Sequence, residues 1–277
     1  MYRIEFKRKL SEFVELMTVR APNVARRTET GQFVIVSAHE DGERIPLTIV
    51  DYNREELTIQ IIYQIVGYST KRLSELNAGD YLPVVLGPLG MPTHYETDGE
   101  VKNILGIGGG VGIAPLYPQM KKFKRDGLNV EVLLGGRSKD LVILKEEIAE
   151  FADALYFATD DGSLGIQGLV TDRLKSLLTE GKSYDLIVAI GPMVMMRAVV
   201  AVTKPLNIPT GVSLNPLMVD GTGMCGCCRV DIGGETKFAC VDGPDFDGLK
   251  VNFDEVIHRL SFYKEEEHLC RIRGGMQ

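Results

Sequence analysis

Residues 218–243 read MVDGTGMCGCCRVDIGGETKFACVDG and contain four of the chain's five cysteines. Cys225, Cys228 and Cys240 fit the last three places of the plant-type [2Fe–2S] pattern, which is C-x4-C-x2-C followed by a distant fourth cysteine. The first place in this chain holds Asp220. The spacing therefore predicts an iron–sulfur cluster with three thiolate ligands and one carboxylate ligand.

Other readings of these residues stay open. Zinc prefers two close pairs of Cys or His in a closed tetrahedral shell, whereas this chain has one C-x2-C pair. Disulfides fit poorly, because no N-terminal segment resembles a signal peptide and we therefore expect a reducing, cytoplasmic location. Asp-Gly is also a common turn pair, so Asp220 could serve only a turn, with Cys227 or an unseen partner residue as the fourth ligand.

Length and charge limit the classes of function. A chain of 277 residues exceeds one typical domain, and a net charge of −7 without a basic run argues against a nucleic-acid partner. The longest uncharged stretch, 103–120, carries five glycines and two prolines, so we expect a strand, a loop and a helix start there. No membrane span is expected.

The first part of the chain predicts an antiparallel β-barrel. Turn signals such as Asp41-Gly42 separate six β-rich runs, and short strands at this spacing form barrels or sandwiches. One short helix is expected near 69–77, and the polar segment 94–100 predicts a boundary, so the barrel is assigned residues 1–97. The predicted strands are Tyr2–Lys9, Phe13–Arg20, Gln32–Ser37, Leu47–Asp51, Leu57–Val66 and Tyr81–Val85.

Beyond residue 98 the pattern changes to alternating strands and helices, which is typical of a parallel α/β sheet. This domain is assigned residues 98–210, and a small C-terminal cluster domain is assigned residues 211–277. The predicted strands are Lys102–Ile107, Val130–Leu134, Ala154–Thr159, Leu186–Ile190 and Val212–Leu214, and the predicted helices are 113–125, 142–152, 168–179 and 193–203.

Two segments at the predicted strand ends carry nucleotide-binding chemistry. In the first, Gly108, Gly109, Gly110 and Gly112 precede Ala114 and Pro115 at a helix start, where backbone amides can meet a pyrophosphate. The second contains Gly191 and Pro192. The first segment does not match G-x-G-x-x-[GA] in any register, which disfavours a Rossmann dehydrogenase, and a Gly-rich turn alone leaves nucleotide binding open.

The order of these motifs resembles the ferredoxin-NADP reductase superfamily. That order is a barrel, a Gly-Gly-x-Gly-x-Ala-Pro loop, a Gly-Pro-x-x-Met-Met turn and a C-terminal cluster loop. Within the superfamily, electron-transfer subunits of dihydroorotate dehydrogenase share the domain order but have four cysteines at the cluster. The aspartate in the first ligand place is closer to the small subunits of NADH-dependent reduced ferredoxin:NADP oxidoreductases, also described as sulfide dehydrogenase beta subunits.

The resemblance implies cofactor contacts for residues that would otherwise be an ordinary strand, a capped helix or core. Family members hold FAD with two segments, and the nicotinamide dinucleotide lies on the Gly-rich loop with Gly191-Pro192 beside its nicotinamide. Arg137 follows the second strand of the α/β domain, where the family reads the adenosine ribose; NADH is favoured by the resemblance, and NADPH is not excluded. The implied FAD residues are Arg44, Pro46, Leu47, Thr48, Ile62, Tyr63, Gln64, Gly67, Ser69 and Thr70.

We therefore expect an electron-transfer flavoprotein subunit that passes electrons between NAD(H), FAD and a [2Fe–2S] cluster, with no protein acid or base as catalytic residue. The resemblance implies a larger partner subunit with flavin and [4Fe–4S] clusters, related to the glutamate synthase small subunit, and ferredoxin as substrate of a bifurcating complex. A dihydroorotate dehydrogenase subunit and a sulfide dehydrogenase subunit are alternatives. A zinc-stabilised nucleotide-binding module is the non-enzyme alternative.

Overall fold

The computed structural model describes residues 1–95 and 100–273, which form two compact units. Unit 1 comprises Met1–Pro92, Asn215–Pro244 and Asp254–Gln277, and unit 2 comprises Thr93–Leu214 and Asp245–Phe253. The predicted boundary between 97 and 98 lies outside the described residues. The predicted division into three functional domains stays a prediction.

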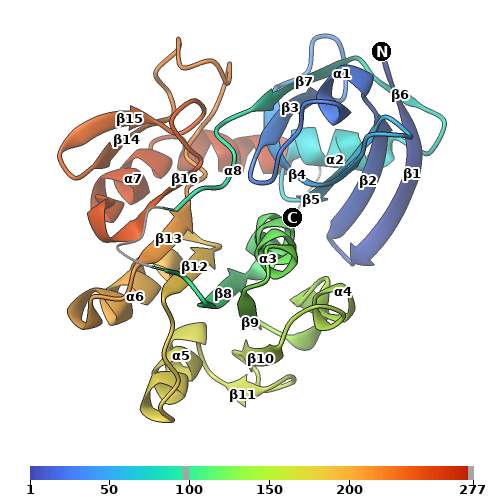
Figure 1. The fold of residues 1–277 in the computed structure, drawn as a ribbon. Coiled ribbons are helices and arrows are strands. Elements are labelled where there is room, and N and C mark those ends of the chain that lie inside the picture. The colour runs from blue at the N-terminus through green and yellow to red at the C-terminus, as the bar shows by residue number, and fades with distance from the viewer. Residues whose placement is uncertain (96–99, 274–277) are drawn as a thin grey trace. The chain divides into compact units, whose positions relative to one another are not determined.

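Unit 1 is built on a nearly closed antiparallel barrel, as the sequence predicted (Figure 1). Its strands follow the order β6-β1-β2-β5-β4-β3-β7, and Pro83 alone separates β6 from β7, so the two ends of the sheet are continuous in the chain. The elements are β1 Tyr2–Ser11, β2 Val14–Arg20, α1 Pro22–Ala25, β3 Phe33–Ser37, β4 Ile45–Asn53, β5 Thr58–Gln64, α2 Tyr68–Glu75, β6 Tyr81–Leu82 and β7 Val84–Leu89.

Inward-pointing aliphatic side chains fill the barrel, because strand residues alternate between its two faces. Ile4, Met17, Val34, Ile59 and Ile61 are completely buried within one hydrophobic cluster. Burying each such side chain contributes about 1.5–3 kcal/mol relative to leaving it in water. The barrel is therefore a packed core, and ligands have only its outer surface and edges available.

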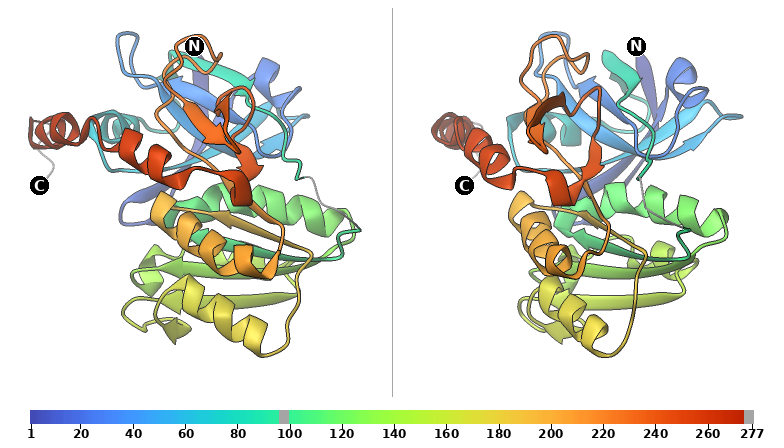
Figure 2. Two further views of the ribbon diagram at one scale, coloured as in Figure 1. Left: turned by 90° about the vertical axis from the view of Figure 1, so that its left-hand side faces the viewer. Right: turned by 60° about the vertical axis from the view of Figure 1, so that its left-hand side comes forward.

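Unit 2 is an α/β sheet whose strand order is β11-β10-β9-β8-β12-β13-β16. Figure 1 shows α3 and α4 on one face and α5 and α6 on the other, and the left view of Figure 2 shows the strands between α3 and α5. The elements are β8 Asn103–Gly109, η1 Gly110–Gly112, α3 Ile113–Arg125, β9 Asn129–Gly136, η2 Lys139–Leu141, α4 Lys145–Ala149, β10 Ala154–Thr159, β11 Ile166–Gln167, α5 Val170–Thr179, β12 Leu186–Ile190, α6 Met193–Thr203, η3 Lys204–Leu206, β13 Thr210–Ser213, β16 Asp245–Asp247 and η4 Gly248–Lys250.

The chain leaves β8 toward β9 and β10 and later returns to the other side of β8 as β12 and β13. The direction of winding therefore reverses between β8 and β12. In open α/β sheets, the crevice for a ligand forms at the carboxyl ends of the strands on either side of such a reversal. The two Gly-containing segments follow β8 and β12 directly.

The C-terminal part of unit 1 carries the cysteines. A hairpin of β14 Arg229–Ile232 and β15 Glu235–Phe238 lies between Cys228 and Cys240, and helices α7 Phe253–Leu260 and α8 Lys264–Arg273 end the described chain. Gly233 and Gly234 form the hairpin turn with φ values of +64° and +87°, the left-handed conformation that a two-residue type I′ turn requires.

Three expectations about elements differ from the structure. The helix predicted over 142–152 spans only Lys145–Ala149, because Leu144 adopts a left-handed φ of +56° and ends the helix on its N-terminal side. The barrel has a second short helix, α1, of four residues. The sheet of unit 2 is not wholly parallel, since β16 pairs antiparallel with β13.

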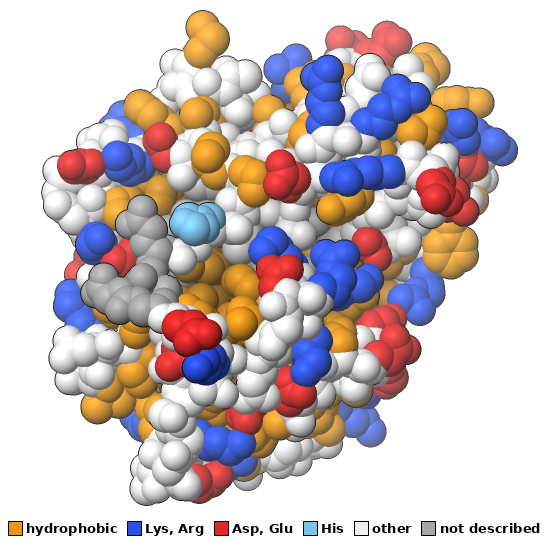
Figure 3. Space-filling model, viewed as in Figure 1, with side chains coloured by type: hydrophobic (Ala, Val, Ile, Leu, Met, Phe, Trp, Pro, Cys, Tyr) orange, Lys and Arg blue, Asp and Glu red, His pale blue; other side chains and the backbone are white. Residues whose placement is uncertain are grey.

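Among the described residues, no helix is both long enough and apolar enough to cross a bilayer. On the face in Figure 3, acidic and basic side chains are interspersed.

Candidate cofactor sites

The Gly-rich segment lies at the winding reversal of unit 2. Strand β8 runs into η1 and then α3, so backbone amides at the start of α3 point toward the carboxyl edge of the sheet. Gly110 has a left-handed φ of +56°, and a Cβ there would have no heavy atom within 4 Å. Ala114 is buried beneath the loop and Pro115 is half-buried in the first turn of α3. A glycine-rich backbone that is open at Gly110 and leads into a helix fits a pyrophosphate.

The structure brings Gly191-Pro192 against this loop. Gly108 pairs with Ile190, which directly precedes Gly191. A Cβ on Gly112 would lie 2.5 Å from the Ile190 carbonyl oxygen, and one on Gly109 would lie 2.3 Å from Sδ of Met195. The two segments therefore touch through their backbones and the start of α6, as the predicted site requires.

Arg137 follows β9 at the same edge and is exposed. Sequence reasoning missed the acidic pair that the structure places beside it: the amides of Asp160 and Asp161 donate to the carbonyl oxygens of Gly136 and Arg137, both at 3.2 Å. Hydrogen bonds from the hydroxyl and amide of Ser163 hold the pKa of Asp161 below its usual value. The sequence did contain a signal for this neighbourhood. The strands before Arg137 and Asp160 were both predicted in one parallel sheet, and neighbouring parallel strands end at the same edge.

In the barrel, Arg44 directly precedes β4 and is exposed. Pro46, Leu47 and Thr48 pair with β3 on one side, while the pairing of β4 with β5 begins only at Ile49. The other edge of this half of β4 is therefore not engaged with β5. Pro46 fits such an edge, since it has no amide to donate.

The side chains of the second predicted FAD segment are mostly engaged in contacts within the protein. Ile62 and Tyr63 are buried in β5, while Gln64 is half-buried at its end. The Tyr63 hydroxyl donates to Oε2 of Glu15 at 2.6 Å. A flavin could therefore meet this segment through backbone and through Gln64, but not through the Tyr63 ring.

At the start of α2, the Thr70 hydroxyl oxygen accepts from the amides of Val66 and Gly67 at 3.0 and 3.1 Å. Ser69 donates to a carboxylate oxygen of Glu43. A Cβ on Gly67 would meet no heavy atom within 4 Å, so the helix start is sterically open. Its first amides have no acceptor within the helix and remain suited to a phosphate.

The cysteine loop presents its predicted ligands as two pairs. The Sγ atoms of Cys228 and Cys240 lie 3.2 Å apart, and both residues are buried. Oδ2 of Asp220 accepts from the Cys225 amide at 2.8 Å, and Cys225 is exposed. A two-iron cluster takes two protein ligands on each iron, and these residues supply three thiols and one carboxylate. The donor set therefore fits.

Protonation of these groups has identifiable causes. Hydrogen bonds from the amides of Thr222 and Cys225 hold the pKa of Asp220 below its usual value, so it is a carboxylate with lone pairs left over. The Cys227 amide lowers the pKa of Cys225, whereas the hydrogen bond with Cys225 raises that of Cys227. Burial raises the pKa of Cys240 to about 12, and bound iron would deprotonate such a thiol.

Within the part of the chain that the structure describes, no three His, Cys, Asp or Glu side chains converge on one metal position. The cysteine loop packs on the barrel near the first predicted FAD segment. Gly221 has a φ of +76°, and a Cβ there would lie 2.7 Å from Cδ1 of both Ile35 and Leu89. Ile35 also pairs with Pro46 of β4. Ile35 is therefore a neighbour both of the loop that follows Asp220 and of the half of β4 that does not pair with β5.

Comparison with known proteins follows the same division. The family model for the iron–sulfur cluster binding domain of dihydroorotate dehydrogenase B matches residues 215–252, and the one for the oxidoreductase NAD-binding domain matches residues 107–201. The dihydroorotate dehydrogenase B (NAD(+)) electron transfer subunit homolog of Thermotoga maritima is 45% identical, covering 96% of this chain and 93% of that protein. An uncharacterized protein from the adh 3′ region of Clostridium beijerinckii is 49% identical, covering 98% and 94%.

Among solved structures, one of the NADH-dependent reduced ferredoxin-NADP oxidoreductase, described as giving insights into flavin-based electron bifurcation, superposes with a TM-score of 0.91. It is 43% identical, covering 99% of this chain and 97% of the other. The ferredoxin reductase in carbazole 1,9a-dioxygenase has a TM-score of 0.62 at 19% identity, covers 75% of this chain and 65% of that one, and shares the fold alone.

Proposed function

The chain belongs to the family of dihydroorotate dehydrogenase B electron-transfer subunits and their homologues, and on that premise we propose that it is the electron-transfer flavoprotein subunit of a NADH-dependent reduced ferredoxin:NADP oxidoreductase. The observation that carries this choice within the family is the match to the bifurcating oxidoreductase over nearly the whole of both chains. Asp220 in the first ligand place supports it.

When bound, the cofactors supply the redox chemistry: FAD exchanges a hydride with the nicotinamide and single electrons with the cluster, which carries one at a time. The protein's task is to bind and orient them. Arg44, directly before β4, would pair with the FAD pyrophosphate, and Thr48, in the half of β4 that does not pair with β5, would face the flavin edge. The contact of Gly221 with Ile35 supports a short path from that half-strand to the cluster.

In unit 2, Gly110 and the start of α3 would receive the dinucleotide pyrophosphate, while Gly191-Pro192 would support the nicotinamide. Arg137 and Asp161 oppose each other electrostatically at the adenosine end, since the cation favours a 2′-phosphate and the carboxylate a free ribose hydroxyl. Because Asp161 is held in place by Ser163, we assign the coenzyme as NADH.

An electron-transfer subunit needs a second polypeptide to complete the reaction. We assign that role to a larger subunit with flavin and [4Fe–4S] clusters, resembling the glutamate synthase small subunit, and ferredoxin reaches the complex through it. The proposal places the complex in the cytoplasm, where thiols stay reduced.

The test is anaerobic isolation of the native complex, followed by assay of NADP⁺ reduction. We expect reduction only when NADH and reduced ferredoxin are both present, and a yellow-brown small subunit that contains FAD and iron. Activity with either donor alone, or a colourless zinc protein, would refute the assignment.

The second candidate is the electron-transfer subunit of a dihydroorotate dehydrogenase. It is favoured by the match of residues 215–252 to that enzyme's cluster-binding domain. The same isolated complex distinguishes the two, because dihydroorotate-dependent NAD⁺ reduction would be found only for this candidate.

A further inference from the structure

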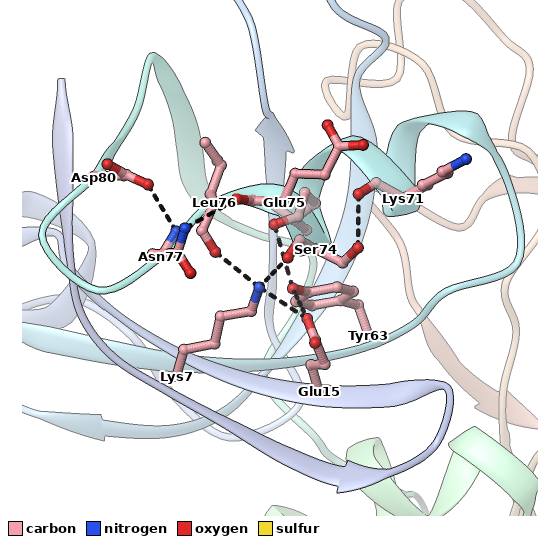
Figure 4. A network of polar contacts seen from close by, with 10 residues as sticks. Lys7, Glu15, Tyr63, Lys71, Ser74, Glu75, Leu76, Asn77 and Asp80 are labelled. Atoms are coloured by element: carbon pink, nitrogen blue, oxygen red, sulfur yellow. Dashed lines mark hydrogen bonds and ion pairs between the residues drawn. The ribbon is translucent and has the colours of Figure 1, made fainter.

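A polar network of Lys7, Glu15 and Tyr63 lies at the C-terminal end of α2 (Figure 4). Of these three residues, only Tyr63 belongs to a predicted cofactor segment. Lys7 of β1 pairs with Glu15 of β2 at 3.0 Å, and their side chains are 14% and 6% exposed. Tyr63 of β5 donates to the same carboxylate oxygen. Three adjacent barrel strands therefore each contribute one polar side chain to a single cluster.

The network is directed at the helix. Nζ of Lys7 donates to the carbonyl oxygens of Ser74 and Leu76, the second at 2.8 Å, and the Tyr63 hydroxyl reaches the Leu73 carbonyl at 3.4 Å. These carbonyls lie in the last turn of α2 and at its C-cap, at the end that carries partial negative charge. The Leu73 carbonyl also accepts from the Leu76 amide at 3.3 Å. The ammonium group therefore both caps α2 and complements its dipole.

Elsewhere on α2, Ser69 donates to Glu43 and Nε of Arg72 donates to Nε2 of His39 at 2.8 Å, but neither contact reaches the C-terminal carbonyls of the helix. The helix has eight residues, and Leu73 is its only buried one. A helix this short has little stability of its own and takes its position from tertiary contacts. Removing the charges of Lys7 and Glu15 from water costs free energy, and apolar residues in their place would often give equal stability. A requirement for a fixed position of α2 therefore explains this ion pair better than stability does.

That requirement is visible at the other end of the helix. The N-cap and first turn of α2 contain Gly67, Ser69 and Thr70, which the sequence predicts as FAD contacts and whose open amides suit a phosphate. A rigid helix transmits a displacement of its C-terminus to its N-terminus. We propose that Lys7, Glu15 and Tyr63 are positioning residues for FAD: they fix α2 so that its N-terminal amides meet the pyrophosphate. The inference rests on the proposed function.

The test compares Lys7→Met with Lys9→Met, a matched change at an exposed position of the same strand. FAD affinity is measured by quenching of flavin fluorescence, and amide hydrogen exchange is followed by mass spectrometry in the FAD-loaded protein. We expect Lys7→Met to weaken FAD binding about tenfold and to accelerate exchange in residues 68–76, with β2 and β5 unchanged, while Lys9→Met resembles wild type.

Equal acceleration in β2, β5 and α2 would mean that the network only stabilises the barrel, and unchanged FAD affinity would also overturn the inference. If Lys7→Met does not fold, Tyr63→Phe removes one hydroxyl and is expected to give the same pattern at about threefold. Wild-type protein that binds no FAD would instead refute the proposed function, so the two failures are distinguishable.

Discussion

At the scale of single residues, the spacing of the cysteines assigns Cys225, Cys228 and Cys240 to the cluster and leaves Cys227 out. Replacing any one of the three by Ser is expected to remove or severely destabilise the cluster, because a hydroxyl is a poor substitute for a thiolate on iron. Cys227→Ala should retain iron. Iron and sulfide content, measured anaerobically with FAD content as the folding control, checks this. Loss of iron in Cys227→Ala alone would mean that the register is wrong.

The carboxylate of Asp220 accepts one hydrogen bond on each oxygen, which serves the turn and still leaves lone pairs for iron. A thiolate donates more electron density than a carboxylate, so Asp220→Cys is expected to keep the cluster and lower its midpoint potential, whereas Asp220→Ala should make it labile. Redox titration followed by electron paramagnetic resonance measures both. If all three proteins share one potential and one stability, Asp220 is a turn residue only.

At the scale of elements, the coenzyme site depends on the approach of η1 to the end of β12. A Cβ on Gly112 would lie 2.5 to 2.7 Å from backbone atoms of Ile190 and Gly191, which cannot move aside as a side chain can. Gly112→Ala is therefore expected to cost about 1–3 kcal/mol of unfolding free energy and to weaken NADH binding.

Gly136→Ala is the matched control, because a Cβ there would have ordinary contacts of 3.4 Å or more. Its unfolding free energy should stay within about 0.5 kcal/mol of wild type in urea denaturation. Equal stability of the two variants would show that the two loops can separate without cost.

The same pair of strands is joined at its other end by Asp185, whose Oδ2 accepts from the amides of Lys102 and Asn103 at 2.9 and 2.8 Å. These bonds hold the pKa of Asp185 below its usual value. A lowered folded-state pKa means that the stabilisation is present above the unfolded pKa and is lost as pH falls through the folded one.

Asp185→Asn is accordingly expected to cost about 1 kcal/mol near neutral pH, and the difference from wild type should shrink below about pH 4. Urea denaturation at a series of pH values measures it, with exposed Asp140→Asn as the control. A difference that does not depend on pH would exclude the carboxylate charge as its source.

At the scale of the whole molecule, the sequence could predict features that depend on neighbouring residues better than features that depend on residues far apart in the chain. The strand–helix alternation predicted helices at 113–125 and 193–203, where α3 and α6 lie. The spacing of the cysteines predicted the cluster ligands, which stay a prediction. Strand β16 has three residues and no pattern, so only its pairing with β13 defines it. The association of Lys7 with Ser74 joins segments far apart in sequence, which no local pattern encodes.

The residues proposed for the three cofactors lie in different segments of the chain, so each cofactor is expected to be removable without loss of the others. Arg44→Ala is expected to weaken FAD binding by about 1.5–3 kcal/mol through loss of charge-assisted phosphate contacts, while iron content stays unchanged. Protein of this variant stripped of FAD should then show no bleaching of the cluster absorption with NADH, although dithionite bleaches it, and added FAD should restore the response.

Conversely, Cys228→Ser should lose iron while NADH still bleaches the flavin band. This pair of results follows because a nicotinamide delivers two electrons as a hydride, which a one-electron cluster cannot accept directly, so FAD must stand between them. Arg27→Ala, at an exposed arginine of the same unit, is the control and should behave as wild type. NADH-dependent bleaching of the cluster in FAD-free protein would contradict the order nicotinamide, flavin, cluster. It would also remove the proposed reason why the half of β4 that does not pair with β5 lies near the cysteine loop.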